Sequence, residues 1–308
     1  MTVPPDAAAV PPAATGPRAD AGVIHDIGYR GYQGPRLGRS YATRSLFTQG
    51  LRGAFGLGRA GRSKVLPMLI VAAMALPAAA LVAITVLQHG DRLVTDYPQY
   101  LDGVGLLFAE IFVAAQAPVL LSRDLRNHTV PLYFSRPITR TDYVRAKAAA
   151  MVCALLLVMA SPLLILYVGA LLGGLDIGHN TAHLGFGLLA ALLYAVVFSA
   201  VGLLVAAATP RRGFGVAAIM GLLVVSQLIA SILSALLDNR VGDSSRWPYL
   251  LSPSSLVRLF TNQVCGLARQ GGAPGTPAGA VGAAVFGLAI AGLVAGSYGL
   301  LLRRYRNI

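Results

Sequence analysis

Long apolar runs alternate with short polar segments along most of this chain. Six runs cover approximately residues 65–88, 102–121, 148–173, 184–208, 216–237 and 279–302. A hydrocarbon core about 30 Å thick takes roughly 20 residues of helix to cross, at a rise of about 1.5 Å each. Because the runs are continuous and show no alternation of polar and apolar side chains, they predict helices and not barrel strands. The pattern therefore predicts an all-α integral membrane protein with six transmembrane helices.

The chain before the first apolar run divides into two parts. Residues 1–39 are rich in Pro and Ala and lack aliphatic periodicity, which predicts a disordered tail. A transmembrane domain is expected over residues 40–308. On a helical wheel, residues 44–59 gather apolar side chains on one arc and Arg on the other, which favours an amphipathic interfacial helix over an unstructured basic linker. The apolar arc holds Leu46, Phe47, Leu51, Ala54 and Leu57.

Composition and charge agree with a membrane protein and orient it. Apolar residues make up 56% of the chain and charged residues only 12%, with a net charge of +13. Of the 25 Lys and Arg residues, 20 lie in segments 1–64, 122–147, 209–215 and 303–308. By the positive-inside rule, both termini and segment 122–147 are predicted to be cytoplasmic. Anionic headgroups account for the basic charge, so no nucleic-acid partner is expected. The preference for Arg over Lys indicates a GC-rich genome and hence a bacterial inner membrane.

The sequence contains no convincing motif for nucleotide binding, metal binding or catalysis. The stretch GLGRAG at residues 56–61 matches a dinucleotide fingerprint, but a surface helix precedes it where a strand is required. No phosphate-binding loop of the form GxxxxGK[ST] occurs, so we expect no cofactor bound by this chain. His179 and His183 are four residues apart, yet only Asp176 is near them in sequence, so we expect interfacial loop histidines and no metal site. No catalytic set is recognisable, and the chain is not expected to be an enzyme.

Glu110 lies near the middle of the second apolar run, where an isolated carboxylate would cost several kcal/mol. It is a candidate pathway residue that contacts substrate or a proton in a polar cavity. It could equally be a protonated acid bonded to a neighbouring helix, or mark a misplaced span boundary. Two pairs of small residues, Gly169 with Gly173 and Gly292 with Gly296, would let helices approach closely.

The longest external loop is predicted at residues 238–279. Ser252 followed by Pro253 indicates a helix start, and apolar residues recur at helical spacing from Leu256 to Val264. Trp247 and Tyr249 precede it, as expected at a membrane interface. We expect a short helix on or in the outer leaflet, with an ordinary loop as the alternative.

The hairpin at residues 122–147 is too small to bury a core of its own and must pack against something else. Pro131 and Pro137 interrupt helix in its middle, and Thr139 with Asp142 predicts an N-terminal capping arrangement for the third span. The apolar knob framed by Arg in this hairpin indicates a docking point for a cytoplasmic partner. The knob consists of Leu132, Tyr133 and Phe134.

The stretches RDLRNHT and SRPITR, with Tyr143 and Lys147 after them, resemble the signature of type-two ABC export permeases. In that family the segment between the second and third spans is a coupling helix that fits a groove on a separately encoded ATPase. The resemblance implies a dimer of identical or different permease subunits in the lipid bilayer, with two ATPase copies that bind ATP and Mg and drive export. It assigns ATPase coupling to Arg126, Asn127, His128, Thr129, Leu132, Tyr133, Phe134, Arg136 and Pro137.

Three other functions remain open at this point. An ATP-independent carrier or channel usually needs several polar or charged groups within the membrane, and Glu110 stands nearly alone there. A lipid-modifying membrane enzyme would need His, Asp or Glu clustered at one interface. A membrane anchor or assembly protein would need neither feature.

Overall fold

The computed structural model describes residues 34, 37–90, 92–122, 124, 133, 138–209, 211–267 and 274–306. Every regular element among them is helical, and six helical stretches are long and apolar enough to cross a membrane. The predicted disordered tail lies almost wholly outside the described residues. The prediction of an all-α protein with six membrane-spanning helices is confirmed.

Each of the six spanning stretches overlaps one of the six apolar runs of the sequence, and several begin up to eight residues before it. The second consists of three successive helical elements, which together run continuously from Tyr97 to Leu120. They are α3 (Tyr97–Tyr100), the π-helix η1 (Leu101–Gly105) and α4 (Leu106–Leu120). The other five are α2 (Arg62–Leu87), α7 (Arg140–Leu172), α8 (Ile177–Ala208), α9 (Arg212–Val241) and α11 (Ala280–Arg306).

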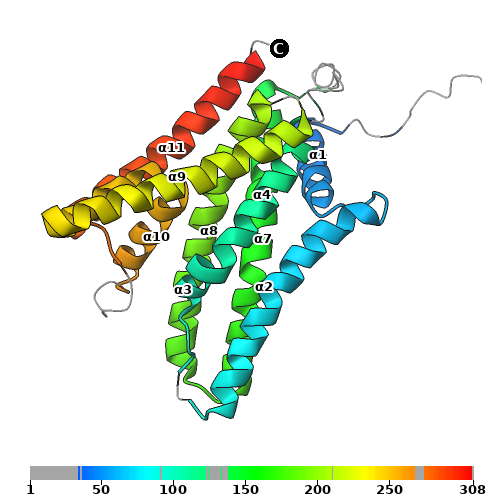
Figure 1. Ribbon diagram of the computed structural model, residues 1–308. Coiled ribbons are helices and arrows are strands. Elements are labelled where there is room, and N and C mark those ends of the chain that lie inside the picture. Colours follow the sequence, from blue (N-terminus) through cyan, green and yellow to red (C-terminus); the bar gives the residue numbers. More distant parts are fainter. Residues whose placement is uncertain are drawn as a thin grey trace, which may run out of the picture. The chain divides into compact units, whose positions relative to one another are not determined.

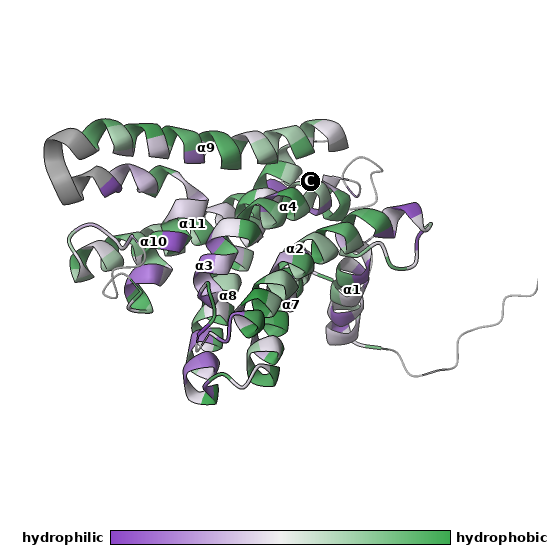
Figure 2. Cartoon of the chain, turned by 60° about the horizontal axis from the view of Figure 1, so that its bottom comes forward, coloured by the Kyte–Doolittle hydropathy of each residue, from purple (hydrophilic) through white to green (hydrophobic). Residues whose placement is uncertain are grey.

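Helices α4, α7 and α8 form the centre of the membrane domain (Figure 1). Helix α2 packs on α7, α9 on α4, and α11 on α8. In the most apolar part of each helix, 50–56% of residues are buried in the three central spans but only 17–22% in the three outer ones. Figure 2 shows apolar residues along the length of α2 and α9. The outer helices therefore present apolar side chains suited to lipid or to another membrane subunit.

Two glycine pairs with the same spacing have different surroundings. A Cβ atom at Gly169 would lie only 2.5 Å from a methyl group of Val82, and Gly173 is similarly close to α2. This pair confirms the prediction of close helix approach, because its missing side chains let α2 and α7 come together. A Cβ atom added at Gly292 or Gly296 would have no neighbour within 4 Å, so that pair makes no such contact among the described residues.

Helix α1 (Arg39–Ala54) packs on α7 and α4 through its buried residues Leu46, Gly50 and Ala54. At Gly50 the approach is close enough that an added Cβ would lie 3.0 Å from Ala150 of α7. Leu46 and Ala54 belong to the apolar arc expected from the sequence, so part of that arc covers protein. The helix ends before Leu57, which lies in the following turn. Its position at a membrane surface stays a prediction.

The predicted long loop after α9 contains the 3₁₀ helix η2 (Gly242–Leu251) and α10 (Pro253–Val264). The helix start is confirmed: the hydroxyl of Ser252 accepts a hydrogen bond from the backbone N–H of Ser255. Helix α10 packs against α8, α9 and α11. The side-chain oxygen of Gln227 on α9 accepts hydroxyl hydrogen bonds from Ser252, Ser254 and Ser255 at 2.7, 2.8 and 2.7 Å. These bonds fasten the start of α10 to a spanning helix.

Candidate functional site

The hairpin between the second and third spans begins after α4 ends at Leu120 and finishes where α7 begins at Arg140. Tyr133 is the one predicted coupling residue that the structure describes. The others lie outside the described residues: Arg126, Asn127, His128, Thr129, Leu132, Phe134, Arg136 and Pro137. The described part of the site consists of the residues that hold the two ends of the hairpin.

An ion pair joins the start of the hairpin to α7. The Nζ atom of Lys147 lies 2.8 Å from Oδ2 of Asp124, and the side chains are only 9% and 15% exposed. The hydroxyl of Tyr143 donates a second hydrogen bond to the same carboxylate oxygen, at 2.8 Å. A charge pair with this little exposure is costly to break, because the remaining charge is left without its counter-charge. The chain just after α4 is therefore held firmly against α7.

Aromatic rings continue this anchor towards the predicted knob and the C-terminal helix. The ring of Tyr133 lies 5.6 Å from that of Tyr143, which lies 5.3 Å from that of Tyr305 on α11. The ammonium group of Lys147 is 5.5 Å from the centre of the Tyr143 ring. Such spacings are typical of favourable aromatic pairs and cation–π contacts. Tyr133 is thus connected through Tyr143 to both α7 and α11.

The far end of the hairpin is fixed by the predicted cap of α7, which is confirmed. The backbone N–H of Asp142 donates to the hydroxyl of Thr139, and the backbone N–H of Thr139 donates to the carboxylate of Asp142. Arg39 of α1 donates from Nε and Nη2 to the two oxygens of that carboxylate, at 2.6 and 3.0 Å. This hydrogen bonding and the negative charge of Asp142 raise the pKa of Arg39. This link could not be predicted from the sequence because Arg39 and Asp142 are far apart along the chain.

A polar cavity of about 460 Å³ lies between α1, the end of α4, the hairpin and α7. Asp124, Tyr133 and Lys147 line one side of it, and Gln49 and Arg59 come from α1 and the turn that follows. The anchor residues and the N-terminal helix therefore share one surface. This surface, with the ion pair and the cap, is the candidate coupling site.

The candidate pathway residue Glu110 is buried in α4, with 5% of its surface exposed. Its carboxylate makes no hydrogen bond or ion pair with any other described residue. It is not the single acid in this region, since Asp102 in the π-helical turn η1 accepts a 2.6 Å hydrogen bond from the hydroxyl of Tyr194 on α8. Tyr194 lies within electrostatic range of both acids and of Arg258 on α10. Sequence reasoning missed Asp102 because it starts the predicted span, where a polar residue is ordinary.

The family of this membrane domain follows from its similarity to known proteins. No curated protein matches the chain. Residues 107–305 match the sequence profile of a family described as ABC-2 family transporter protein. The match includes the hairpin and all spans from α4 to α11, and it confirms the resemblance drawn from the RDLRNHT and SRPITR stretches. The chain is a multi-pass membrane protein that belongs to the ABC-2 family of transporter permeases.

Proposed function

We propose that this permease is the transmembrane subunit of an ATP-driven exporter in a bacterial inner membrane, moved by a separately encoded ATPase. The observation that carries the proposal is the double anchoring of the hairpin. Asp124 and Lys147 hold its beginning, and the Thr139–Asp142 cap holds its end. A short segment fixed at both ends transmits a push on its middle to the helices that hold it. The hairpin and both termini face the cytoplasm in this proposal, as the distribution of basic residues predicts.

The anchors define where a force on the hairpin would go. The ion pair connects the hairpin to α4 and α7, and the ring of Tyr133 connects it through Tyr143 to α11. Arg39 connects the cap at the end of the hairpin to α1. In the proposed cycle, two ATPase subunits bind ATP and Mg, close together, and move the hairpins of two permease subunits. Exposed apolar side chains on α2, α9 and α11 offer surface for the second permease subunit and for lipid.

The proposal is tested by co-purification and by ATP hydrolysis. The tagged chain is isolated from native membranes in mild detergent, and a bound ATPase subunit is expected in the eluate. Tyr133→Ala, Phe134→Ala and Arg136→Glu are expected to lower the hydrolysis that the permease stimulates while the protein stays inserted. Leu172→Ala is the control, because Leu172 is 85% exposed at the opposite end of α7. Absence of any ATPase subunit, or equal stimulation by all four variants, would contradict the proposal.

A second candidate is an ion-coupled carrier that works without an ATPase, favoured by the buried acids. Glu110 and Asp102 lie near the same tyrosine inside the membrane domain, where acids commonly mark proton or ion pathways. The two candidates separate in liposomes that contain the purified chain alone. Under a pH gradient and without nucleotide, the carrier would move protons or solute and the permease of an exporter would not.

A further inference from the structure

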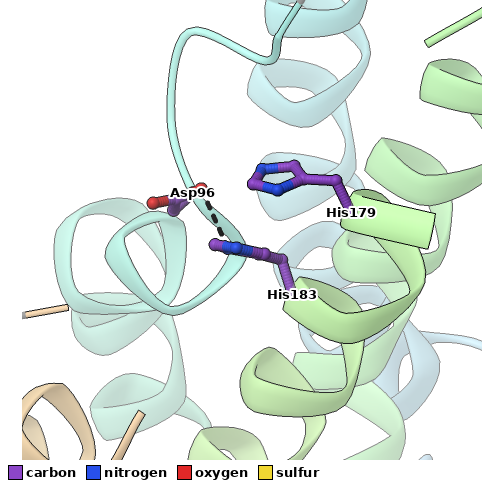
Figure 3. A group of neighbouring side chains, drawn as sticks. All are labelled: Asp96, His179 and His183. Atoms are coloured by element: carbon purple, nitrogen blue, oxygen red, sulfur yellow. Dashed lines mark ion pairs between the residues drawn. The ribbon is translucent and has the colours of Figure 1, made fainter. Parts of the chain in front are cut away.

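Three side chains with metal-binding groups meet at the end of the membrane domain opposite the hairpin (Figure 3). Asp96 precedes α3, and its backbone carbonyl accepts the first helical hydrogen bond from Tyr100. His179 and His183 lie one turn apart at the beginning of α8, and both rings are directed towards Asp96. Asp176 is the acidic residue nearest to the histidines in sequence, but its carboxylate caps α8 by accepting from the backbone N–H of His179 at 2.9 Å. Asp96 was missed because it lies in a different part of the chain.

The two elements that carry these side chains are fastened to each other. Helix α3 packs on α8, and the hydroxyl of Tyr97 donates a 3.0 Å hydrogen bond to the side-chain oxygen of Asn180. Gly187, two turns further along α8, lets Tyr97 come close, since a Cβ there would lie 2.7 Å from that of Tyr97. The position of Asp96 relative to the two histidines is therefore set by packed structure and not by the loop alone.

The Nδ1 atom of His183 is buried and makes no hydrogen bond to any described residue. The side chain as a whole is only 9% exposed. The nitrogen atom faces Oδ1 of Asp96 at 3.3 Å, close enough for an ion pair but without the geometry of a hydrogen bond. A buried polar atom left in this state is costly and calls for a partner. A cation between the nitrogen and the carboxylate would satisfy both.

The distance between His183 and Asp96 fits a tetrahedral ion. Two ligands each about 2.0–2.1 Å from a zinc ion at a tetrahedral angle are separated by roughly 3.3 Å, as Nδ1 of His183 and Oδ1 of Asp96 are. One ligand atom from each of the three residues lies within 4.8 Å of the others. The His179 ring therefore has to move closer to the other two ligand atoms to bind the same ion. A cavity of about 170 Å³ is lined by all three side chains. It has room for an ion and for water as the fourth ligand, because a water molecule takes about 30 Å³.

We propose that Asp96, His179 and His183 form an external site for a divalent transition-metal ion of the Zn²⁺ class. Two imidazoles and one carboxylate are the donor set that zinc prefers, whereas magnesium and calcium prefer oxygen ligands alone. The ion joins the outer end of the second span to the outer end of the fourth. Bound metal therefore resists any separation of α3 from α8.

The test measures zinc binding to the full-length chain, purified in detergent and freed of metal with EDTA. Titration calorimetry with ZnCl₂ near neutral pH is expected to show one ion per chain. His183→Ala, His179→Ala and Asp96→Asn should each weaken binding by about a hundredfold, since even loss of groups that only support ligands costs about 10- to 100-fold. His89→Asn is the matched control: it removes an external imidazole outside the cluster, and Asn tolerates the positive φ of 52° found there.

The outcomes separate a metal site from a simple ion pair between His183 and Asp96. Saturable binding in the wild type and in His89→Asn, with loss in the three cluster variants, supports the site. Absence of zinc binding in the wild type overturns it, and so does equal loss in His89→Asn. Circular dichroism of the metal-free variants checks folding, and Asp96→Asn, which keeps the size of the side chain, provides a second test if either His→Ala variant unfolds.

Discussion

The buried pair of Asp124 and Lys147 provides a direct measure of how firmly the hairpin is anchored. The charged atoms are 2.8 Å apart. At an effective dielectric constant of 20, which suits a pair near a protein surface, their attraction amounts to about 6 kcal/mol before desolvation is subtracted. Removal of one member of such a pair typically costs about 3–5 kcal/mol, because the remaining charge is left in a poorly solvated place. Lys147→Met is therefore expected to destabilise the folded permease by about that amount.

The assay is unfolding of the purified chain in mixed micelles as SDS is increased, followed by circular dichroism. Lys147→Arg keeps the charge and serves as the control for a change of side-chain shape. Asp124→Asn should destabilise strongly as well, but the double variant Asp124→Asn/Lys147→Met should lose clearly less than the two single losses together. This non-additivity is expected because each single change removes the same interaction.

Two results would refute the reasoning. If Lys147→Met and Lys147→Arg unfold at the same SDS fraction, the charge contributes nothing to the anchor. If the single losses add in the double variant, the two side chains do not interact in the folded protein. Arg39→Gln gives a useful comparison, because Arg39 is 56% exposed and its removal should shift the transition less than Lys147→Met does.

Three further expectations concern other parts of the chain. Gly169→Ala should destabilise the protein by about 1–3 kcal/mol, because the added methyl group would overlap Val82. Gly292→Ala adds a methyl group in open space and should be neutral or stabilising by up to about 1 kcal/mol. SDS unfolding compares the two variants, and equal effects would contradict the packing argument. Glu110→Gln should leave the protein as stable or more stable in the same assay, because it removes a buried carboxylate that has no hydrogen bond to the described residues; a large loss would reveal a partner. Arg92→Gln should tighten zinc binding severalfold in calorimetry, because the Arg92 side chain lines the cavity and its charge opposes the ion; unchanged affinity would place the ion elsewhere.

Local features of this fold were predictable from the sequence. The apolar runs located all six spanning stretches, and the Thr139–Asp142 spacing predicted the cap of α7. Ser252 followed by Pro253 predicted the start of α10. In each case the signal lies within a few neighbouring residues, because helix length and helix capping depend on local chain geometry.

Long-range pairings were not predictable in the same way. Nothing in the sequence near Lys147 indicates that Asp124 would be its partner, and nothing near His183 indicates Asp96. The two glycine pairs make the same point, since identical spacing gave a close helix contact at Gly169 and open space at Gly292. Such differences depend on which helices pack together, and that is decided by the whole fold. Candidate sites made of distant residues therefore require the three-dimensional arrangement.

The second span connects the two sites proposed for this permease. Asp96 directly precedes one end of it and Asp124 follows the other, so the coupling anchor and the proposed metal site are attached to one continuous helical stretch. If the ATPase moves the hairpin and thereby shifts this span against α8, the distance between Asp96 and the two histidines changes. Zinc binding and ATP binding are then linked thermodynamically. If ATP changes the zinc affinity by some factor, zinc must change the ATP affinity by the same factor. Zinc titrations of the assembled transporter with and without a non-hydrolysable ATP analogue measure that factor. Equal zinc affinities in the two states would mean that the outer end of the span stays still while the hairpin moves.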